Sequence, residues 1–236
     1  MSSNISEKAL RVIDNIIEHE KPLALFLCGS CANGYEKEDS DIDVVAIIDG
    51  ASSKKAIKKG AKVETHYINK DVVDKFEIIY PYSWMRIVPF LNENLTQKIS
   101  KTTKTTIVKN EFKNLTLIYQ KSGKEPKADV LFPIINFSTK DTIKKPWRMK
   151  PFERLLHSEK TLDILRDEYQ PIFDELVDNG TLIRENNSYQ LSPNFIFSKQ
   201  KPEVNYPFSW KASRSWLGFY YLKNLNKIRK YRNLVV

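Results

Sequence analysis

Short apolar runs separated by turn residues are the clearest pattern in the first third of the chain. Leu23–Cys28 is a continuous apolar run closed by Gly29, which predicts a buried strand. Asp41–Ile48 begins a second apolar run, and Lys62–Ile68 alternates polar and apolar residues as a half-buried strand does. Before these runs, Asn4–Glu20 places apolar residues at helical spacing. The pattern therefore predicts one helix followed by three strands.

Apolar residues recur at helical spacing again further along the chain. Ser158–Val177 repeats apolar residues as a helix does, and Pro171 is expected to begin a second helix within it. Asp178–Gly180 is a stop signal, and Thr181–Arg184 and Ser188–Ser192 are two short runs that predict a hairpin. A helix, a glycine stop and a hairpin together resemble the last helix and the wing of a winged-helix module.

The middle of the chain has a less regular pattern. Lys70–Asn92 mixes helical and aromatic positions and is interrupted by two prolines. Gln97–Lys113 is basic and threonine-rich, which is typical of a solvated helix or loop but would also suit the path of a triphosphate or polynucleotide. Asn114–Tyr119, followed by polar residues and Gly123, predicts a further strand and a turn.

Polar residues that suit phosphate and metal chemistry stand at the ends of the first two predicted strands. Asp41 and Asp43 alternate with an apolar residue, so a strand would direct both carboxylates to one face, with Cα atoms roughly 6.6 Å apart at ~3.3 Å per residue. Two carboxylates this close repel each other unless a cation compensates them. Mg²⁺ fits because it binds one or two carboxylates together with substrate phosphates. Gly29 and Ser30 offer backbone N–H groups and a hydroxyl to a phosphate.

This joint pattern resembles the signature of the polymerase-β-like nucleotidyltransferase superfamily, in the small stand-alone form that often reads G-S-x-A-x-G followed by S-D-I-D. The matching residues are Gly29, Ser30, Ala32, Gly34, Ser40, Asp41, Ile42 and Asp43. The chain departs from the pattern at Asn33, where many members carry an arginine. The resemblance covers about residues 20–125. The alternative is that the Gly-Ser pair is an ordinary turn and the Ser-Asp pair begins a strand.

The resemblance implies a third carboxylate on a later strand, between apolar residues, and Glu64 is the best-placed acid. An exposed strand acid is the alternative for Glu64, since alternation alone places polar residues outside. His66 lies on the same face two residues later. It could flank the site, but we expect a surface or hydrogen-bonded side chain. The resemblance thus implies two magnesium ions and a bound nucleoside triphosphate, with three acids as catalytic and metal ligands and two residues for the phosphates: Asp41, Asp43, Glu64, Gly29 and Ser30.

The net charge of +9 lies almost entirely at the end of the sequence. Residues 199–236 contain nine Lys/Arg and one acid, which is +8 of the +9. Such a basic segment favours an RNA, DNA or protein acceptor as partner. The alternative is that its aromatic helix, from about Ser209, folds back on the protein and its cations coat the surface.

The two cysteines form the pattern Cys28-x-x-Cys31, but the three histidines are scattered and supply no second pair of ligands for zinc. We therefore expect structural cysteines. The sequence has no run of 18 apolar residues and no signal-peptide pattern, so we expect a cytoplasmic protein without a membrane partner.

These observations predict an α+β protein. A mixed-sheet nucleotidyltransferase domain would span residues 1–140, a proline-bounded basic linker 141–157, and a smaller, mostly helical domain with the winged-helix-like hairpin 158–236. The predicted activity is magnesium-dependent transfer of a nucleoside monophosphate from a triphosphate to an acceptor that the sequence leaves open. The alternative function is a nucleic-acid-binding regulator whose nucleotidyltransferase fold senses nucleotide or has lost activity.

Overall fold

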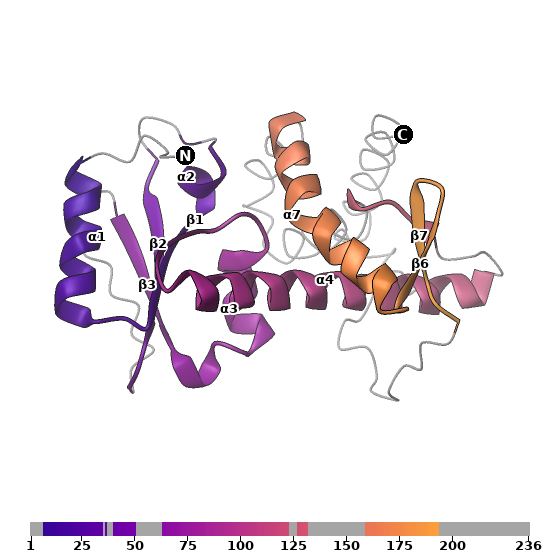
Figure 1. Ribbon diagram of the computed structural model, residues 1–236, viewed down its shortest axis with the longest axis horizontal. Coiled ribbons are helices and arrows are strands. Elements are labelled where there is room, and N and C mark those ends of the chain that lie inside the picture. The colour runs from indigo at the N-terminus through magenta and orange to yellow at the C-terminus, as the bar shows by residue number, and fades with distance from the viewer. Residues whose placement is uncertain are drawn as a thin grey trace, which may run out of the picture. The chain divides into compact units, whose positions relative to one another are not determined.

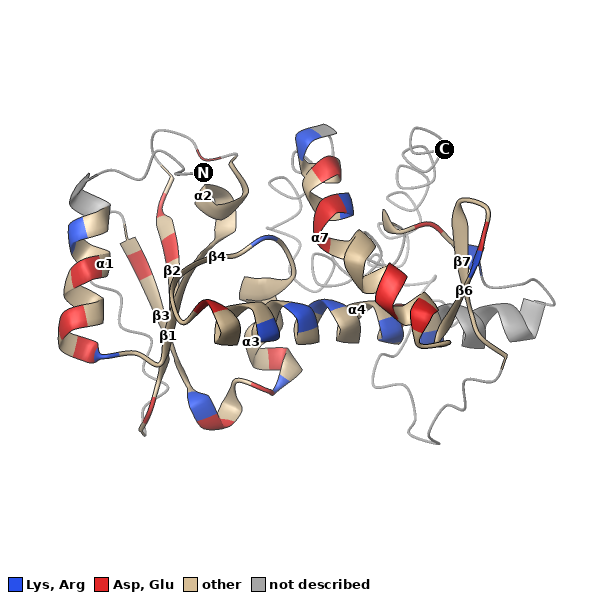
Figure 2. Ribbon diagram, in the orientation of Figure 1, with Lys and Arg blue, Asp and Glu red and all other residues tan. Residues whose placement is uncertain are grey.

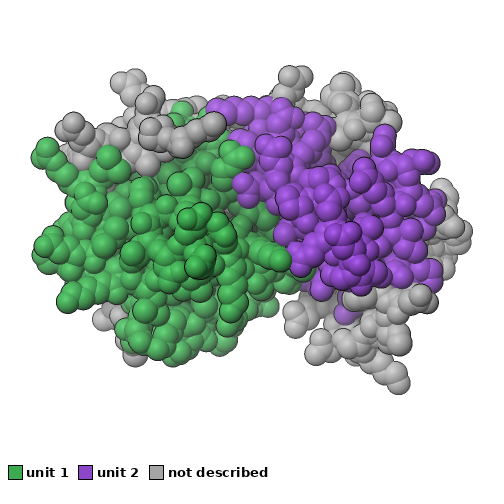
Figure 3. All heavy atoms as spheres, viewed as in Figure 1, with its two compact units in different colours: residues 1–106 green, residues 107–236 purple. Residues whose placement is uncertain are grey.

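A computed structural model describes residues 7–34, 36, 40–50, 63–122, 127–131 and 159–193. Contacts between Cα atoms divide the chain into two compact units, residues 1–106 and 107–236 (Figure 3). Each unit is built around a sheet of its own. The predicted linker at 141–157 and the basic segment at 199–236 lie outside the described residues.

The first unit contains a mixed sheet of four strands in the order β3-β2-β1-β4. β1 (Ala24–Cys28) pairs antiparallel with β2 (Ile42–Ile48) and with β4 (Val88–Leu91). β2 in turn pairs parallel with β3 (Val63–Asn69). The strands predicted from the three apolar patterns are therefore confirmed, and so is the mixed sheet of an α+β protein.

The helix α1 (Glu7–Glu20) covers one face of this sheet. Ile13 and Ile16 are one turn apart on α1, and both are buried in a cluster with Leu25 and Leu27 of β1. This apolar stripe is the reason the segment folds as a helix against the sheet. The predicted helix is confirmed, while its expected start at residue 4 lies outside the described residues.

The other face is covered by α3 (Phe76–Ser83) and the first turns of α4 (Glu93–Ser122), which follow the short helix η1 (Lys70–Val72) (Figure 1). Ile79 and Ile99 project from the two helices into a cluster with the alternate residues of β1 and β2 that point to this face of the sheet. Because β1 is buried on both faces, all five of its residues are apolar.

The helix α4 is 30 residues long, and the strand predicted at residues 114–119 was wrong. Residues such as Thr116 and Ile118 are favoured in strands, but strand propensity is a weak preference that its surroundings override. No glycine or proline interrupts the sequence from Glu93 to Ser122, and the first helix-breaking residue is Gly123.

Of the helices that the structure describes, none combines the length and the apolar character that crossing a membrane would need.

The second unit contains α7 (Glu159–Asp178) and a three-stranded antiparallel sheet in the order β5-β7-β6. β6 (Leu182–Glu185) and β7 (Ser188–Leu191) form the predicted hairpin, and β5 (Lys127–Ala128) pairs with β7. Gly180 adopts a φ of 73° after α7, as the predicted glycine stop requires. The predicted helix, stop and hairpin are confirmed.

Pro171 lies inside α7 and does not begin a second helix, so this part of the prediction was wrong. Proline removes one hydrogen bond from a helix interior, and packing outweighs that loss here. Phe173, two residues later, is fully buried and meets Phe112 and Tyr189 edge-on, at ring-centroid distances of 5.9 and 4.8 Å. These aromatic contacts hold the part of α7 that follows Pro171 to the core of the second unit.

Candidate active site

The turn after β1 depends on Gly29. Its φ of +68° lies in the left-handed region that glycine adopts without steric cost. A β-carbon added at this position would lie 2.3 Å from Oδ2 of Asp43, well inside van der Waals contact. Glycine is therefore needed twice here, for the backbone conformation and for the close approach of the Asp43 carboxylate. The chain then enters the short helix α2 (Gly29–Asn33), with Ser30 half-buried in its first turn.

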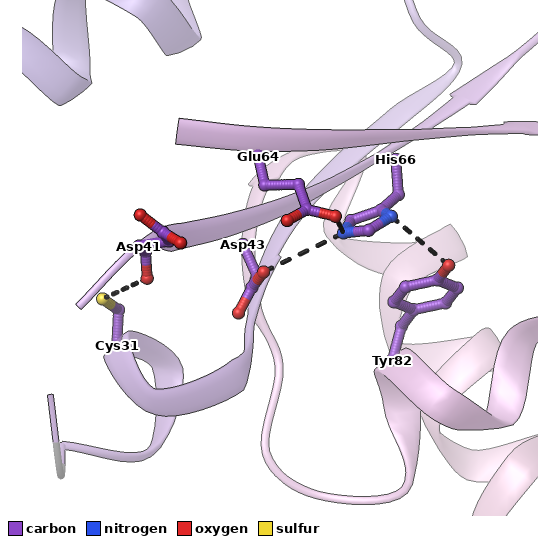
Figure 4. A network of polar contacts seen from close by, with 6 residues as sticks. All are labelled: Cys31, Asp41, Asp43, Glu64, His66 and Tyr82. Atoms are coloured by element: carbon purple, nitrogen blue, oxygen red, sulfur yellow. Dashed lines mark hydrogen bonds and ion pairs between the residues drawn. The ribbon is translucent and has the colours of Figure 1, made fainter. Parts of the chain in front are cut away.

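Asp43 and Glu64 lie side by side because β2 and β3 are parallel and these two residues are register partners. Their side chains are 34% and 30% exposed, so both carboxylates are partly removed from water but still open on one side. Figure 4 shows both side chains on the same side of the sheet. The two acids that the sequence assigned to different strands thus form one pair.

His66 completes a cluster with these two acids. It is 8% exposed, and its Nε2 lies 3.1 Å from Oε1 of Glu64 and 3.9 Å from Oδ1 of Asp43 (Figure 4). On the other side of the ring, Nδ1 lies 3.3 Å from the hydroxyl of Tyr82. His66 is therefore a buried, hydrogen-bonded histidine, as expected from the sequence, and it also flanks the two acids, which was the alternative.

Asp41 is placed differently from the other two predicted acids. It is exposed just before β2, and its backbone carbonyl accepts a hydrogen bond from Sγ of Cys31 at 3.7 Å (Figure 4). Within the described residues, the group whose possible ligand atoms all lie within 4.8 Å of one another consists of Asp43, Glu64 and His66. The structure therefore brings Asp43 together with Glu64 and His66, and it leaves Asp41 outside this group.

Asn33 is a residue of the site that sequence reasoning noticed only as a departure from the family pattern. Its side chain is buried, and its Nδ2 donates to the carbonyl oxygens of Gly29 at 2.7 Å and Arg86 at 3.3 Å. Its Oδ1 accepts from the backbone N–H of Arg86 at 3.2 Å. The amide thus ties the glycine turn to the segment between α3 and β4, where an arginine would not make the same bonds.

The two cysteines are buried free thiols at the base of this turn. Burial, reinforced by the charges of Asp43 and Glu64, raises the pKa of the Cys28 thiol far above its ordinary range. Burial also raises the pKa of Cys31. A thiol that keeps its proton is a poor nucleophile and a poor metal ligand, which supports the structural role expected for both.

The donor set of the cluster suits a divalent cation. Two carboxylates this close repel each other, and a cation between them removes the repulsion. Carboxylate oxygen and imidazole nitrogen are both common ligands of divalent metals. Because Asp43 and Glu64 are about one-third exposed, such an ion would keep positions open for the oxygens of a substrate. The residues present therefore fit a catalytic metal site.

Residues 10–108 match the model of a protein family described as "Nucleotidyltransferase domain". The matched range contains the whole four-stranded sheet, the glycine turn and the three predicted acids. It agrees with the resemblance to polymerase-β-like nucleotidyltransferases found in the sequence, and the chain carries a domain of this kind. The protein is accordingly a transferase of phosphorus-containing groups. No curated protein is a significant match to the chain.

Proposed function

We propose that the protein transfers a nucleoside monophosphate from a nucleoside triphosphate to an acceptor hydroxyl in a divalent-metal-dependent reaction. The observation that carries the proposal is the convergence of Asp43 and Glu64 beside a turn whose glycine makes room for the Asp43 carboxylate. Asp43 and Glu64, with Asp41 just before β2, would hold magnesium, and we expect two ions. When bound, these ions neutralise phosphate charge and stabilise the negative charge of the leaving pyrophosphate.

The chain's own residues have separate tasks in this reaction. The turn at Gly29 and Ser30 binds the phosphates through backbone N–H groups and the serine hydroxyl, and Asn33 holds that turn in place. Glu64 accepts the proton of the acceptor hydroxyl, whose oxygen then bonds to the α-phosphorus. The bond between the α-phosphorus and its bridging oxygen breaks, and pyrophosphate leaves. The Glu64 side chain is 30% exposed, so it is open to an acceptor on its solvent side.

The second unit supports a winged-helix-like module of the kind predicted from the sequence. The strand order β5-β7-β6, with α7 immediately before the hairpin, is the arrangement expected for such a module. However, α7 carries seven Asp/Glu and two Lys/Arg, so it would repel a phosphate backbone (Figure 2). This charge weakens the alternative of a nucleic-acid-binding regulator that reads its target through α7. An RNA, DNA or protein acceptor held by residues 199–236 is compatible with transfer.

A labelled-nucleotide assay tests the proposal. Full-length protein is incubated with an α-labelled nucleoside triphosphate and a cell extract, with and without Mg²⁺, and the extract is then separated into RNA, protein and small-molecule fractions. We expect metal-dependent label in one fraction and pyrophosphate release, and both should be lost in Asp41→Asn. Asp71→Asn, which changes an exposed acid in η1, is the matched control. Nucleotide binding without transfer in any fraction would favour the regulator instead.

A further inference from the structure

His66 supplies a nitrogen donor at the acidic site. Its Nε2 faces the carboxylate oxygens of Glu64 and Asp43, at 3.1 and 3.9 Å, and the three ligand atoms lie within 4.8 Å of one another. In the tautomer with the proton on Nδ1, the lone pair of Nε2 faces the two carboxylates and is repelled by them, whereas a protonated Nε2 would donate to Glu64. A shared cation would turn this unfavourable contact into three favourable ones. With Nε2 unprotonated, the geometry suits a cation that accepts nitrogen as well as oxygen.

Tyr82 holds the other side of the His66 ring. Its hydroxyl lies 3.3 Å from Nδ1, and the two ring centroids are 4.8 Å apart. When Nδ1 carries the proton and donates it to the tyrosine oxygen, the lone pair of Nε2 points toward Asp43 and Glu64. Metal-binding histidines commonly have a partner of this kind on their second nitrogen, which fixes the ring and its tautomer. The structure thus provides both the ligand and its support.

The type of donor atom decides which ion the site prefers. Mg²⁺ binds oxygen ligands almost exclusively, whereas imidazole suits first-row transition metals. We propose that Asp43, Glu64 and His66 bind a first-row transition-metal dication, with Mn²⁺ taken up more tightly than Mg²⁺. The proposal rests on the proposed function in that it concerns the ion of the same site. It goes further by adding His66 as a metal ligand and Tyr82 as a positioning residue for it.

The test measures metal binding to the full-length protein in the absence of nucleotide. Free Mn²⁺ has an electron paramagnetic resonance signal that is lost on binding, and Mg²⁺ affinity follows from its competition with Mn²⁺. We expect wild-type protein to bind Mn²⁺ at least about tenfold more tightly than Mg²⁺. His66→Gln should weaken Mn²⁺ binding by roughly tenfold or more and change Mg²⁺ binding much less. Equal affinities in the wild type, or an unchanged Mn²⁺ affinity in His66→Gln, would overturn the proposal.

Two further variants separate ligation from folding. Tyr82→Phe keeps the aromatic ring but removes the hydroxyl, and it should weaken Mn²⁺ binding by about tenfold, the lower end of the range for such supporting partners. His19→Gln changes an exposed histidine of α1 and should leave both affinities unchanged. Thermal unfolding of each variant shows whether it is folded. A nitrogen coupling in the spin-echo spectrum of bound Mn²⁺, absent from His66→Gln, would show ligation directly.

The outcome is separable from that of the proposed function. Selective Mn²⁺ binding by a protein that transfers no nucleotide with any metal would support the metal site and contradict the transferase. Mg²⁺-supported transfer by a protein that binds Mn²⁺ no more tightly than Mg²⁺ would do the reverse.

Discussion

The two ends of the β2–β3 pair carry acids in very different settings. At the far end, Asp49 accepts a hydrogen bond from Lys70 at 2.7 Å, and both side chains are well exposed, at 61% and 44%. At the near end, Asp43 and Glu64 are half as exposed and share their space with a buried histidine. An exposed ion pair contributes little to stability, whereas two adjacent, partly buried carboxylates destabilise the fold until a cation joins them. The near end therefore suits a cation, as we propose, and the far end is an exposed ion pair.

The largest difference in turnover should come from replacing one acid at each end of the β2–β3 pair. Asp43→Asn should abolish nucleotide transfer, because it removes a charge that would hold the metal beside the phosphates. Asp49→Asn should leave turnover near that of the wild type, since it breaks only an exposed ion pair. Steady-state transfer assays on both variants provide the measurement. Near-wild-type turnover in Asp43→Asn would mean that the near end has no role in catalysis.

A smaller effect is expected at Glu64. Glu64→Gln keeps the shape of the side chain but removes its basicity, so turnover should fall by roughly 10²–10⁴-fold. Glu77→Gln, an exposed acid in the first turn of α3, is the matched control and should have little effect. Separate values of kcat and KM distinguish loss of the base from loss of binding. Unchanged kinetics would move the third carboxylate elsewhere in the chain.

Two glycines with nearly the same φ sharpen the comparison further. Gly29 and Gly180 have φ values of +68° and +73°, so alanine strains the backbone at both by about 1–2 kcal/mol. Only at Gly29 would the new β-carbon meet the Asp43 carboxylate, while nothing lies within 4 Å at Gly180. Gly29→Ala should therefore lower transfer by up to about 10²-fold, and Gly180→Ala should not. Similar activity losses in both variants would attribute the effect to stability alone.

The smallest expected effect concerns the thiol beneath the site. Burial and the charges of Asp43 and Glu64 raise the pKa of Cys28 above its ordinary value of 9.0. Above pH 9 the unfolded chain loses this proton while the folded protein keeps it, so the free energy of unfolding falls as pH rises. The contribution is complete below pH 9. Denaturant unfolding at pH 8 and 10 should show a smaller alkaline loss in Cys28→Ala than in the wild type; equal losses would contradict it.

Local patterns predicted α1 and the strands β1, β2 and β3 of the first unit, because the apolar residues of these segments are buried and their burial fixes the conformation. The same approach failed at residues 114–119, where strand-favouring residues continue a helix that nothing interrupts. It failed again at Pro171, where the packing of Phe173 outweighs one lost hydrogen bond. At Pro171, the contacts of Phe173 with Phe112 and Tyr189 lie outside the short window that a sequence pattern covers.

Residue type and near spacing by themselves pointed to a glycine turn and an Asp-x-Asp strand as the candidate site, and the family resemblance added Glu64 as a later acid. Only the tertiary structure decided which of them meet. Parallel pairing of β2 and β3 placed Glu64 beside Asp43, and packing of α3 brought Tyr82 to His66 across 16 positions. Asn33 reaches Arg86 across 53 positions. No local rule encodes such partners, because they follow from how the helices and strands pack together.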